Sequence, residues 1–278
     1  MQSLNYVIPT TKKTSYIQQL LKVGFDTVEV GSIVSARLIP QMADTLELIR
    51  NLDFSDTKSN RMVLVVNNKG AEIISGVPEI THISYPHSIS ESFLKKNINA
   101  SVGQSLETVA DIVNICEKSG KQPVIYISMA FGNPYGDPWS KDILVESIAA
   151  LEKLGVKIIP LSNVAIEIEK GIIKEIFSLL IPEFQTIELG LHLHTTNQNW
   201  QENIFAAYDA GCRRYDSVIN GYGGCPMSGK EMLGNLKTEN LVEFSRNQGA
   251  AGSLDLHALD EALKLSALTF MESATFRQ

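Results

Sequence analysis

Residues 187–194 read IELGLHLH, and the fold is best worked out from this stretch. It is short and rich in branched apolar residues, as β-strands are. Successive side chains of a strand point to opposite faces, so Gly190, His192 and His194 share one face and the leucines between them share the other. The leucine face is expected to pack under helices, and the opposite face carries two imidazoles.

Six further stretches have the same strand-like character, and longer stretches with helical periodicity separate them. Several of these helices end at a glycine, which supplies a left-handed C-cap before the next strand. Strand–helix units repeated this often predict a parallel sheet with helices outside it. The predicted strands are 27–32, 61–66, 79–84, 124–130, 156–161, 187–194 and 214–219, and the predicted helices are 10–23, 41–51, 69–76, 105–118, 142–154, 166–181, 200–210, 238–247 and 254–272.

Seven strands leave two architectures open. One is an open doubly wound sheet, and the other is a (β/α)8 TIM barrel whose N-terminal strand is missing or irregular, because the sequence opens with a helical pattern. No linker rich in glycine, serine or proline interrupts the pattern. Residues 1–278 are therefore expected to form a single domain with an extra C-terminal helix.

The composition of the chain argues against several classes of binding partner and cell compartment. The 278 residues carry a net charge of -7, whereas a nucleic-acid or anionic-membrane partner requires a basic face. The three cysteines are few and far apart, as reduced thiols in a cytoplasmic protein are. No stretch has the length of a signal peptide core or a membrane helix. These features predict a cytoplasmic protein that acts on a small molecule.

The two histidines of the IELGLHLH stretch are candidate metal ligands. They lie at the end of a predicted strand, where TIM barrels carry their active sites, and imidazoles two residues apart can bind one metal ion. Asn235 could complete such a site with an amide oxygen. The alternatives are two buried histidines that only hydrogen-bond to neighbours, and a helix-capping role for Asn235.

Two further residues could act in catalysis. Cys225 lies in the glycine-rich loop NGYGGCPM (220–227), where a thiol could donate or accept a proton. Glu29 lies in the otherwise apolar strand TVEVGS (27–32), where a carboxylate is costly to bury without a partner. A mobile loop with an incidental cysteine and a structural ion pair are the alternatives. Asn67 and Asn133, in loops that follow strands, could line a pocket or serve only their turns.

These segments together resemble 3-hydroxy-3-methylglutaryl-CoA (HMG-CoA) lyases, metal-dependent TIM-barrel enzymes related to condensing enzymes of the isopropylmalate synthase type. The resemblance extends over nearly the whole chain. The segments that carry it are VEVGSIVSARLIPQMAD (28–44), LKKNIN (94–99), SMAFGNPYGDPW (128–139), GLHLHTTNQ (190–198) and GYGGCPMSGKEMLGNLKTENLV (221–242).

The resemblance implies a role for each matching position. His192, His194 and Asn235 match the metal ligands of the family, Cys225 matches its catalytic cysteine, and Glu29 matches an acidic residue that supports the site. The implied cofactor is Mg²⁺ or Mn²⁺. The implied reaction is cleavage of HMG-CoA, a small-molecule acyl-CoA, to acetyl-CoA and acetoacetate, with His192 as a base. A homodimer is left open.

The sequence also departs from the family pattern. It begins after the point where the family has an Arg-Asp pair at the end of the first strand, Asn163 stands where a carboxylate is usual, and Thr195 replaces an aspartate. Asn163 is expected to contact substrate together with Asn67 and Asn133. An upstream strand outside this sequence would explain the missing pair. A degenerate barrel that acts as a binding or partner subunit is the alternative function.

Overall fold

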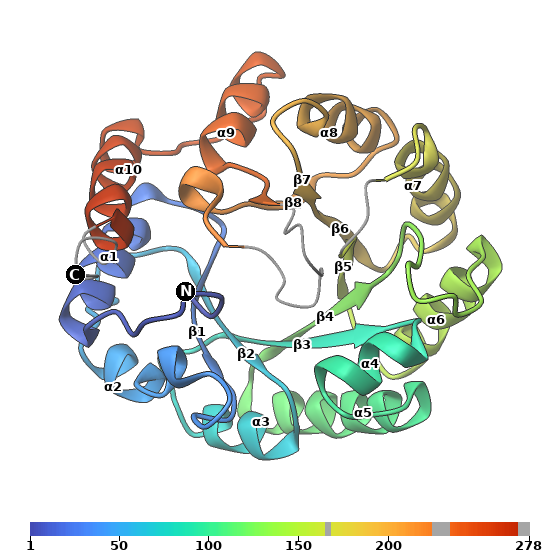
Figure 1. Ribbon diagram of the computed structural model, residues 1–278, viewed down its shortest axis with the longest axis horizontal. Coiled ribbons are helices and arrows are strands. Elements are labelled where there is room, and N and C mark those ends of the chain that lie inside the picture. Colours follow the sequence, from blue (N-terminus) through green and yellow to red (C-terminus); the bar gives the residue numbers. More distant parts are fainter. Residues whose placement is uncertain (165–167, 224–233, 272–278) are drawn as a thin grey trace.

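The seven predicted strands form one curled parallel sheet in the computed structural model, which describes residues 1–164, 168–223 and 234–271. Their carboxyl ends gather at one rim (Figure 1). Two short strands, β7 (His194–Thr195) and β9 (Gly234–Asn235), pair separately and antiparallel at this rim. In order across the sheet, the strands are β1 (Thr27–Ile33), β2 (Asn60–Val65), β3 (His82–Ser88), β4 (Gln122–Ser128), β5 (Ile158–Ser162), β6 (Glu188–His192) and β8 (Arg214–Asp216).

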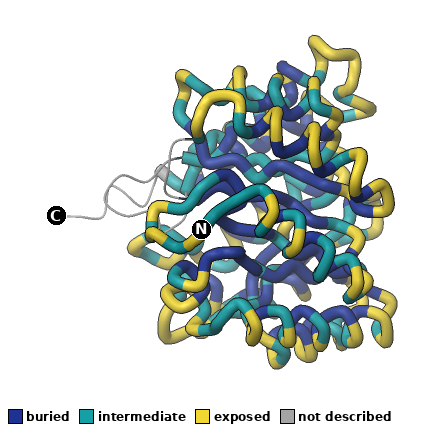
Figure 2. Tube along the Cα trace, turned by 90° about the vertical axis from the view of Figure 1, so that its right-hand side faces the viewer, coloured by how far each residue is buried: buried dark blue, intermediate teal, exposed yellow. Residues whose placement is uncertain are grey.

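The helices form a ring outside the sheet, so that exposed residues lie on the periphery and buried residues follow the strands (Figures 1 and 2). None of the helices in the described residues is long and apolar enough to cross a membrane. The helices are α1 (Thr10–Val23), η1 (Pro40–Met42), α2 (Thr45–Arg50), α3 (Asn68–Ser75), α4 (Glu91–Asn97), α5 (Val102–Ser119), α6 (Lys141–Lys153), α7 (Ile172–Glu183), α8 (Trp200–Asp209), η2 (Ile219–Gly221), α9 (Thr238–Asn247) and α10 (Leu256–Met271).

The architecture is the barrel-like alternative with an irregular N-terminal segment. Within the described residues the sheet has no eighth parallel strand, and β1 and β8 are its two edges. The first residues instead lie beside β1 at the barrel mouth (Figure 1), where Gln2 Nε2 donates to Ser32 Oγ at 3.0 Å. The extra C-terminal helix, α10, packs against α1, and Gln19 Nε2 donates to the carbonyl oxygen of Ala258 at 3.0 Å.

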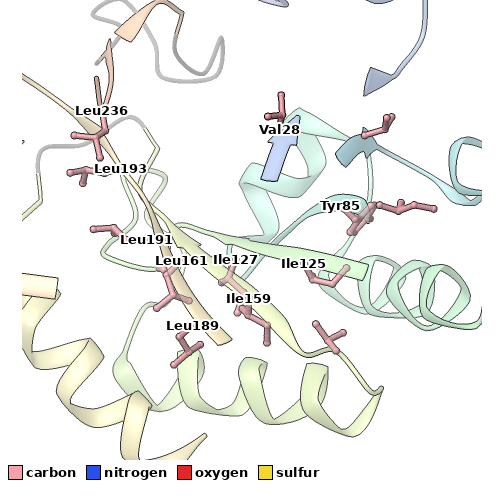
Figure 3. Packing of buried hydrophobic residues seen from close by; sticks show 14 of the residues in the cluster. Val28, Tyr85, Ile125, Ile127, Ile159, Leu161, Leu189, Leu191, Leu193 and Leu236 are labelled. Atoms are coloured by element: carbon pink, nitrogen blue, oxygen red, sulfur yellow. The ribbon is translucent and has the colours of Figure 1, made fainter. Parts of the chain in front are cut away.

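The leucine face of the IELGLHLH stretch packs as predicted. Leu189, Leu191 and Leu193 are at most 5% exposed and belong to the buried layer between the strands and the outer helices (Figure 3). The neighbouring strands contribute alternate residues to the same layer, including Ile125 and Leu161. Burial of this layer is the main stabilising contribution to the barrel, because apolar burial yields roughly 25 cal/mol per Å².

The glycines predicted to end helices adopt the expected conformation. Gly24, Gly120, Gly155 and Gly211 follow four different helices, and their φ angles are 84°, 65°, 91° and 100°. These left-handed conformations are strained for residues with a Cβ atom, which explains the glycine at each turn from helix to strand.

Several element boundaries differ from the sequence prediction. The prediction ended the third strand at residue 84, but β3 continues through Pro86 to Ser88. Proline has no N–H to donate to a neighbouring strand. Pro86 is nevertheless tolerated on the β2 side, because β2 and β3 pair only as far as Ser84. α4 was not predicted, and α7 begins at Ile172 rather than at residue 166. The sixth predicted strand, 187–194, divides into β6 and β7.

A buried histidine beside the barrel wall predicts acid sensitivity. His87 is 0% exposed, its Nδ1 lies 2.8 Å from Ser105 Oγ, and burial lowers its pKa to about 4. Between pH 6.5 and 4, His87 takes up a proton in the unfolded chain but stays neutral in the folded protein. Stability is therefore full above pH 6.5 and is expected to fall by about 3 kcal/mol as the pH drops to 4. Urea unfolding across this range, with His87→Asn as the comparison, isolates the contribution. Equal pH slopes for the two proteins would contradict the prediction.

Candidate active site

The two candidate histidines lie side by side at the rim, on the common face that strand alternation predicted. His192 is the last residue of β6, in register with Ser162 of β5 and Asp216 of β8. His194 belongs to β7, and the two imidazole centroids are 5.1 Å apart. His192 is partly exposed and His194 is 7% exposed, so both border the barrel mouth from the same strand segment.

Asn235 lies directly opposite His194 in the β7–β9 ladder. Directly opposed residues of an antiparallel pair place their side chains on the same face. The Asn235 Nδ2 donates to the carbonyl oxygen of Tyr222 at 3.0 Å, which leaves its Oδ1 as the atom available to a ligand. The residue that caps α9 is Lys237, so Asn235 is not the N-cap of that helix. The structure therefore brings Asn235 to His194.

Asn163 fixes the backbone of His194. Its Oδ1 accepts a hydrogen bond from the His194 amide at 2.7 Å, and its Nδ2 donates to the His194 carbonyl oxygen at 2.7 Å. A carboxylate at this position could accept the first bond but could not donate the second. Asn163 is 1% exposed, so the amide that was predicted to contact substrate is directed at the main chain of the second histidine.

The Asn163 amide pair gives a stability prediction. Asn163→Asp removes the donor to a buried carbonyl oxygen and places a carboxylate beside it, so the free energy of unfolding should fall by about 1–3 kcal/mol. Asn67→Asp is the matched control, because Asn67 is the N-cap of α3 and accepts from the Gly70 amide at 2.9 Å, a role that aspartate fills equally well. Chemical unfolding of both variants measures the difference. Equal stabilities would show that the donor is dispensable.

Asp216 and Tyr126 surround the His192 ring, and sequence reasoning missed both. The Asp216 Oδ2 lies 3.1 Å from His192 Nδ1 and accepts the Tyr126 hydroxyl at 2.7 Å. Burial acts to raise the pKa of Asp216, but the bond from His192 and that from Tyr126 outweigh it and lower the pKa. Burial, followed by the nearby carboxylates of Asp216 and Glu29, raises the pKa of Tyr126 well above its usual value, so the phenol stays a donor.

Glu29 is a carboxyl group poised near neutral pH. Its side chain points away from the buried Val28 and Val30, solvent reaches it, and Asp216 and His192 lie near enough for their charges to shift its pKa. Desolvation by these surroundings, followed by repulsion from Asp216, raises its pKa to about 7, against the opposing effect of His192. A carboxyl group with such a pKa can accept or release a proton at physiological pH.

Gly190 has a steric role beneath the histidines. A Cβ atom at this position would lie 2.9 Å from the Arg214 Cδ, because the Arg214 side chain crosses β6 there. Arg214 reaches the Glu188 carboxylate at 3.0 Å and is one of the charges that lower the pKa of Asp216. The glycine of the LGLHLH segment thus makes room for a cation below the site.

The remaining candidates are dispersed. The Asn67 side chain caps α3, and the Asn133 Oδ1 accepts from the Tyr135 amide at 2.8 Å within its own loop. Both lie near strand ends, and their hydrogen bonds go to backbone amides two or three residues further along the chain. Cys225 lies outside the described residues.

Asp216 and Tyr126 could have been found by the argument that singled out Glu29. Tyr126 lies in the mostly apolar predicted strand VIYISMA (124–130), and Asp216 is a carboxylate in the predicted strand RYDSVI (214–219). A carboxylate or a phenol in such a strand requires a hydrogen-bonding partner in the barrel interior. Strand alternation alone could not show that the two residues meet, because β4 and β8 are not neighbours in the sheet.

In the described ranges, no three His, Cys, Asp or Glu side chains are grouped so that they could hold one metal ion. The candidate set is instead two imidazoles and one amide oxygen, all neutral donors. This chemistry suits a divalent ion that accepts mixed nitrogen and oxygen ligands, whereas structural zinc sites are built largely from thiolates and histidines.

Known proteins resemble this chain over almost its whole length. A family model described as HMGL-like matches residues 1–265. The cytoplasmic 3-hydroxy-3-methylglutaryl-CoA lyase of Rattus norvegicus is 30% identical over 94% of this chain and 76% of that protein. The mitochondrial hydroxymethylglutaryl-CoA lyase of Bos taurus is 31% identical over 94% of this chain and 80% of that protein.

Solved structures agree with the sequence matches. An HMG-CoA lyase from Acenitobacter baumannii, in complex with coenzyme A and 3-methylmalate, is 27% identical with a TM-score of 0.87 and covers 96% of this chain and 87% of that chain. The Bacillus subtilis HMG-CoA lyase is 25% identical with a TM-score of 0.88, covering 96% and 89%. The family model, the relatives and the TIM-barrel neighbours agree, and the chain belongs to the HMGL-like family, whose HMG-CoA lyases it resembles as an enzyme.

Proposed function

We propose that this protein is a carbon–carbon lyase that cleaves 3-hydroxy-3-methylglutaryl-CoA to acetyl-CoA and acetoacetate with the help of a divalent metal ion. The observation that carries the proposal is the convergence of His192, His194 and Asn235 at the rim. Two imidazole rings lie 5.1 Å apart, and the amide lies opposite the second histidine. Membership of the HMGL-like family supports the reaction class.

The ion would be held by the imidazoles of His192 and His194 and by the Asn235 Oδ1. Mn²⁺ and Mg²⁺ are the proposed ions, and the imidazole ligands favour Mn²⁺. A bound divalent ion would act as a Lewis acid on the substrate's hydroxyl and carboxylate oxygens and orient the substrate for bond cleavage. Asn163 supports this arrangement by holding the His194 backbone in place.

The reaction requires one proton acceptor and one proton donor. Removal of the tertiary hydroxyl proton lets that oxygen become the ketone of acetoacetate as the carbon–carbon bond breaks, and the bond electrons pass to the thioester enolate. Glu29, with a pKa of about 7, is the proposed proton acceptor. An imidazole of His192 that binds the ion through one nitrogen and contacts Asp216 through the other has no lone pair left to act as the base that the resemblance implied. Cys225 is the proposed donor that protonates the enolate to acetyl-CoA.

The acyl-CoA substrate is proposed from the likeness to the coenzyme A-bound lyase structure. It would approach the carboxyl ends of the strands, the side on which barrel enzymes bind their substrates. Asn67 and Asn133 lie in loops on this side and remain the proposed substrate contacts. Asn163 could reach substrate only while keeping its bonds to His194.

An assay with purified protein tests the proposal. HMG-CoA and Mn²⁺ are supplied, acetoacetate is measured, and thermal melts over a Mn²⁺ titration report binding independently of turnover. Acetoacetate formation that EDTA abolishes is the expected result. A melting temperature that rises with Mn²⁺ but no product would favour the binding or partner subunit. Absence of both effects would refute the metal site and the lyase together.

A further inference from the structure

Three polar side chains from three strands are hydrogen-bonded in series inside the barrel. Tyr126 comes from β4, Asp216 from β8 and His192 from β6, and all three are partly buried. The Tyr126 hydroxyl is 2.7 Å and the His192 Nδ1 is 3.1 Å from the same Asp216 oxygen. A single carboxylate oxygen therefore receives both contacts, beside a histidine that the proposed function uses.

The chemistry of the three groups fixes the direction of each bond. An ionised carboxylate can only accept hydrogen bonds, so the Tyr126 O–H and the His192 Nδ1 must both be donors. Aspartate is ordinarily ionised at neutral pH, and the Asp216 oxygen has the phenol and the imidazole nitrogen within hydrogen-bond distance, as an accepting carboxylate oxygen does. The neutral imidazole then has its proton on Nδ1, and its Nε2 carries a free lone pair.

The His192 ring is also restrained on two sides. The Tyr126 ring meets it edge-on with centroids 5.5 Å apart, and the His194 ring does so at 5.1 Å. Rotation of the imidazole would bring it against one of these rings and would break the bond to Asp216. The tautomer is therefore set by Asp216, and the ring orientation by Asp216, Tyr126 and His194 together.

We propose that Asp216 and Tyr126 are positioning residues, which hold His192 in the Nδ1–H tautomer and present its Nε2 lone pair to a divalent ion. The role of the ion rests on the proposed function, whereas the tautomer is a property of the metal-free protein. Partners that bind the second nitrogen of a ligating histidine commonly contribute 10- to 100-fold to metal affinity.

The first test reads the tautomer directly. A long-range ¹H–¹⁵N correlation spectrum of the metal-free, ¹⁵N-labelled protein distinguishes protonated from unprotonated ring nitrogens, and the His192 signals are those lost in His192→Gln. The expected result is a protonated Nδ1 in the wild-type protein and a shift toward protonated Nε2 in Asp216→Ala. The matched control, Asp209→Ala, removes a carboxylate from the exposed Lys174 pair and should leave the spectrum unchanged.

The second test measures Mn²⁺ affinity by electron paramagnetic resonance of the free ion. Asp216→Ala should weaken binding about 10- to 100-fold, and Asp209→Ala should not change it. If Asp216→Ala fails to fold, Asp216→Asn keeps the shape, removes the charge and should weaken Mn²⁺ binding by about tenfold. A wild-type His192 protonated on Nε2, or variants with the wild-type tautomer and affinity, would overturn the inference.

The two tests separate this inference from the proposed function. A wild-type protein that binds no Mn²⁺ and cleaves no HMG-CoA refutes the function, while the metal-free spectrum still decides the tautomer. Conversely, a metal-dependent lyase whose His192 tautomer does not respond to Asp216 retains the function and loses the positioning role.

Discussion

Replacing His194 with glutamine is expected to lower kcat/KM for HMG-CoA by at least about a hundredfold and to abolish the rise of melting temperature with Mn²⁺. The imidazole supplies one of three proposed ligands, and loss of one preorganised electrostatic group, such as an oxyanion-hole donor, costs an enzyme about 10²–10³ in rate. The main-chain bonds between Asn163 and His194 do not involve the ring and can persist in the variant. Steady-state kinetics and Mn²⁺-dependent melts provide the measurement.

The control for this variant is His257→Gln. His257 is an exposed residue of α10, so the same chemical change there should alter neither kinetics nor the Mn²⁺ response. Circular dichroism of both variants verifies that the barrel is folded. A His194→Gln protein that keeps wild-type turnover would remove His194 from the metal site, and the proposed mechanism would lose its centre.

The sequence alone was enough to predict which face of the sheet carries the two histidines of the candidate site. Alternation along IELGLHLH placed both imidazoles on one face and the leucines on the other, and the structure has this arrangement. The alternation held although the strand divides at Leu193, because β7 continues in an extended conformation to pair with β9. The resemblance then selected Asn235, which the ladder places opposite His194.

The hydrogen-bond partners of the three candidate asparagines could not be predicted from the sequence. Asn67, Asn133 and Asn163 all stand at strand ends, where an amide can face a ligand or serve the backbone. The structure gives each of them backbone partners, and for Asn163 that partner is the histidine two strands along the chain. A single sequence carries no signal for such a choice, because the partner is a main-chain group and leaves no mark on residue identity.

The interior partnership of Tyr126 and Asp216 was missed for a different reason. Parallel strands that are neighbours in sequence are expected to be neighbours in a barrel, but β4 and β8 are separated by β5 and β6 in the sheet. Their side chains meet across the interior because the sheet curls, and the degree of curl depends on the packing of all strands together. Contacts across a barrel are therefore harder to predict than contacts along its wall.

The largest expected effect on stability lies away from the site, at Lys13. This α1 side chain is 0% exposed, and its Nζ lies 2.6 Å from Asp44 Oδ1 and 2.5 Å from the carbonyl oxygen of Gln41. Lys13→Met should lower the free energy of unfolding by about 3 kcal/mol, because the partly buried Asp44 carboxylate loses its cationic partner and keeps, among the described residues, only the hydrogen bond from the Thr10 hydroxyl. Urea unfolding followed by circular dichroism measures the loss.

Two comparisons decide whether burial is the reason. Lys141→Met breaks an exposed pair with Glu175 of similar length, 2.5 Å, and should cost at most about 1 kcal/mol. The double variant Lys13→Met with Asp44→Leu removes the buried charge together with its partly buried partner and should recover much of the loss, because an ion pair in such surroundings often stabilises a protein no more than apolar residues of similar volume. If Lys13→Met and Lys141→Met lower the free energy of unfolding equally, burial does not strengthen the Lys13–Asp44 ion pair. This pair would then stabilise the protein no more than the exposed pair does.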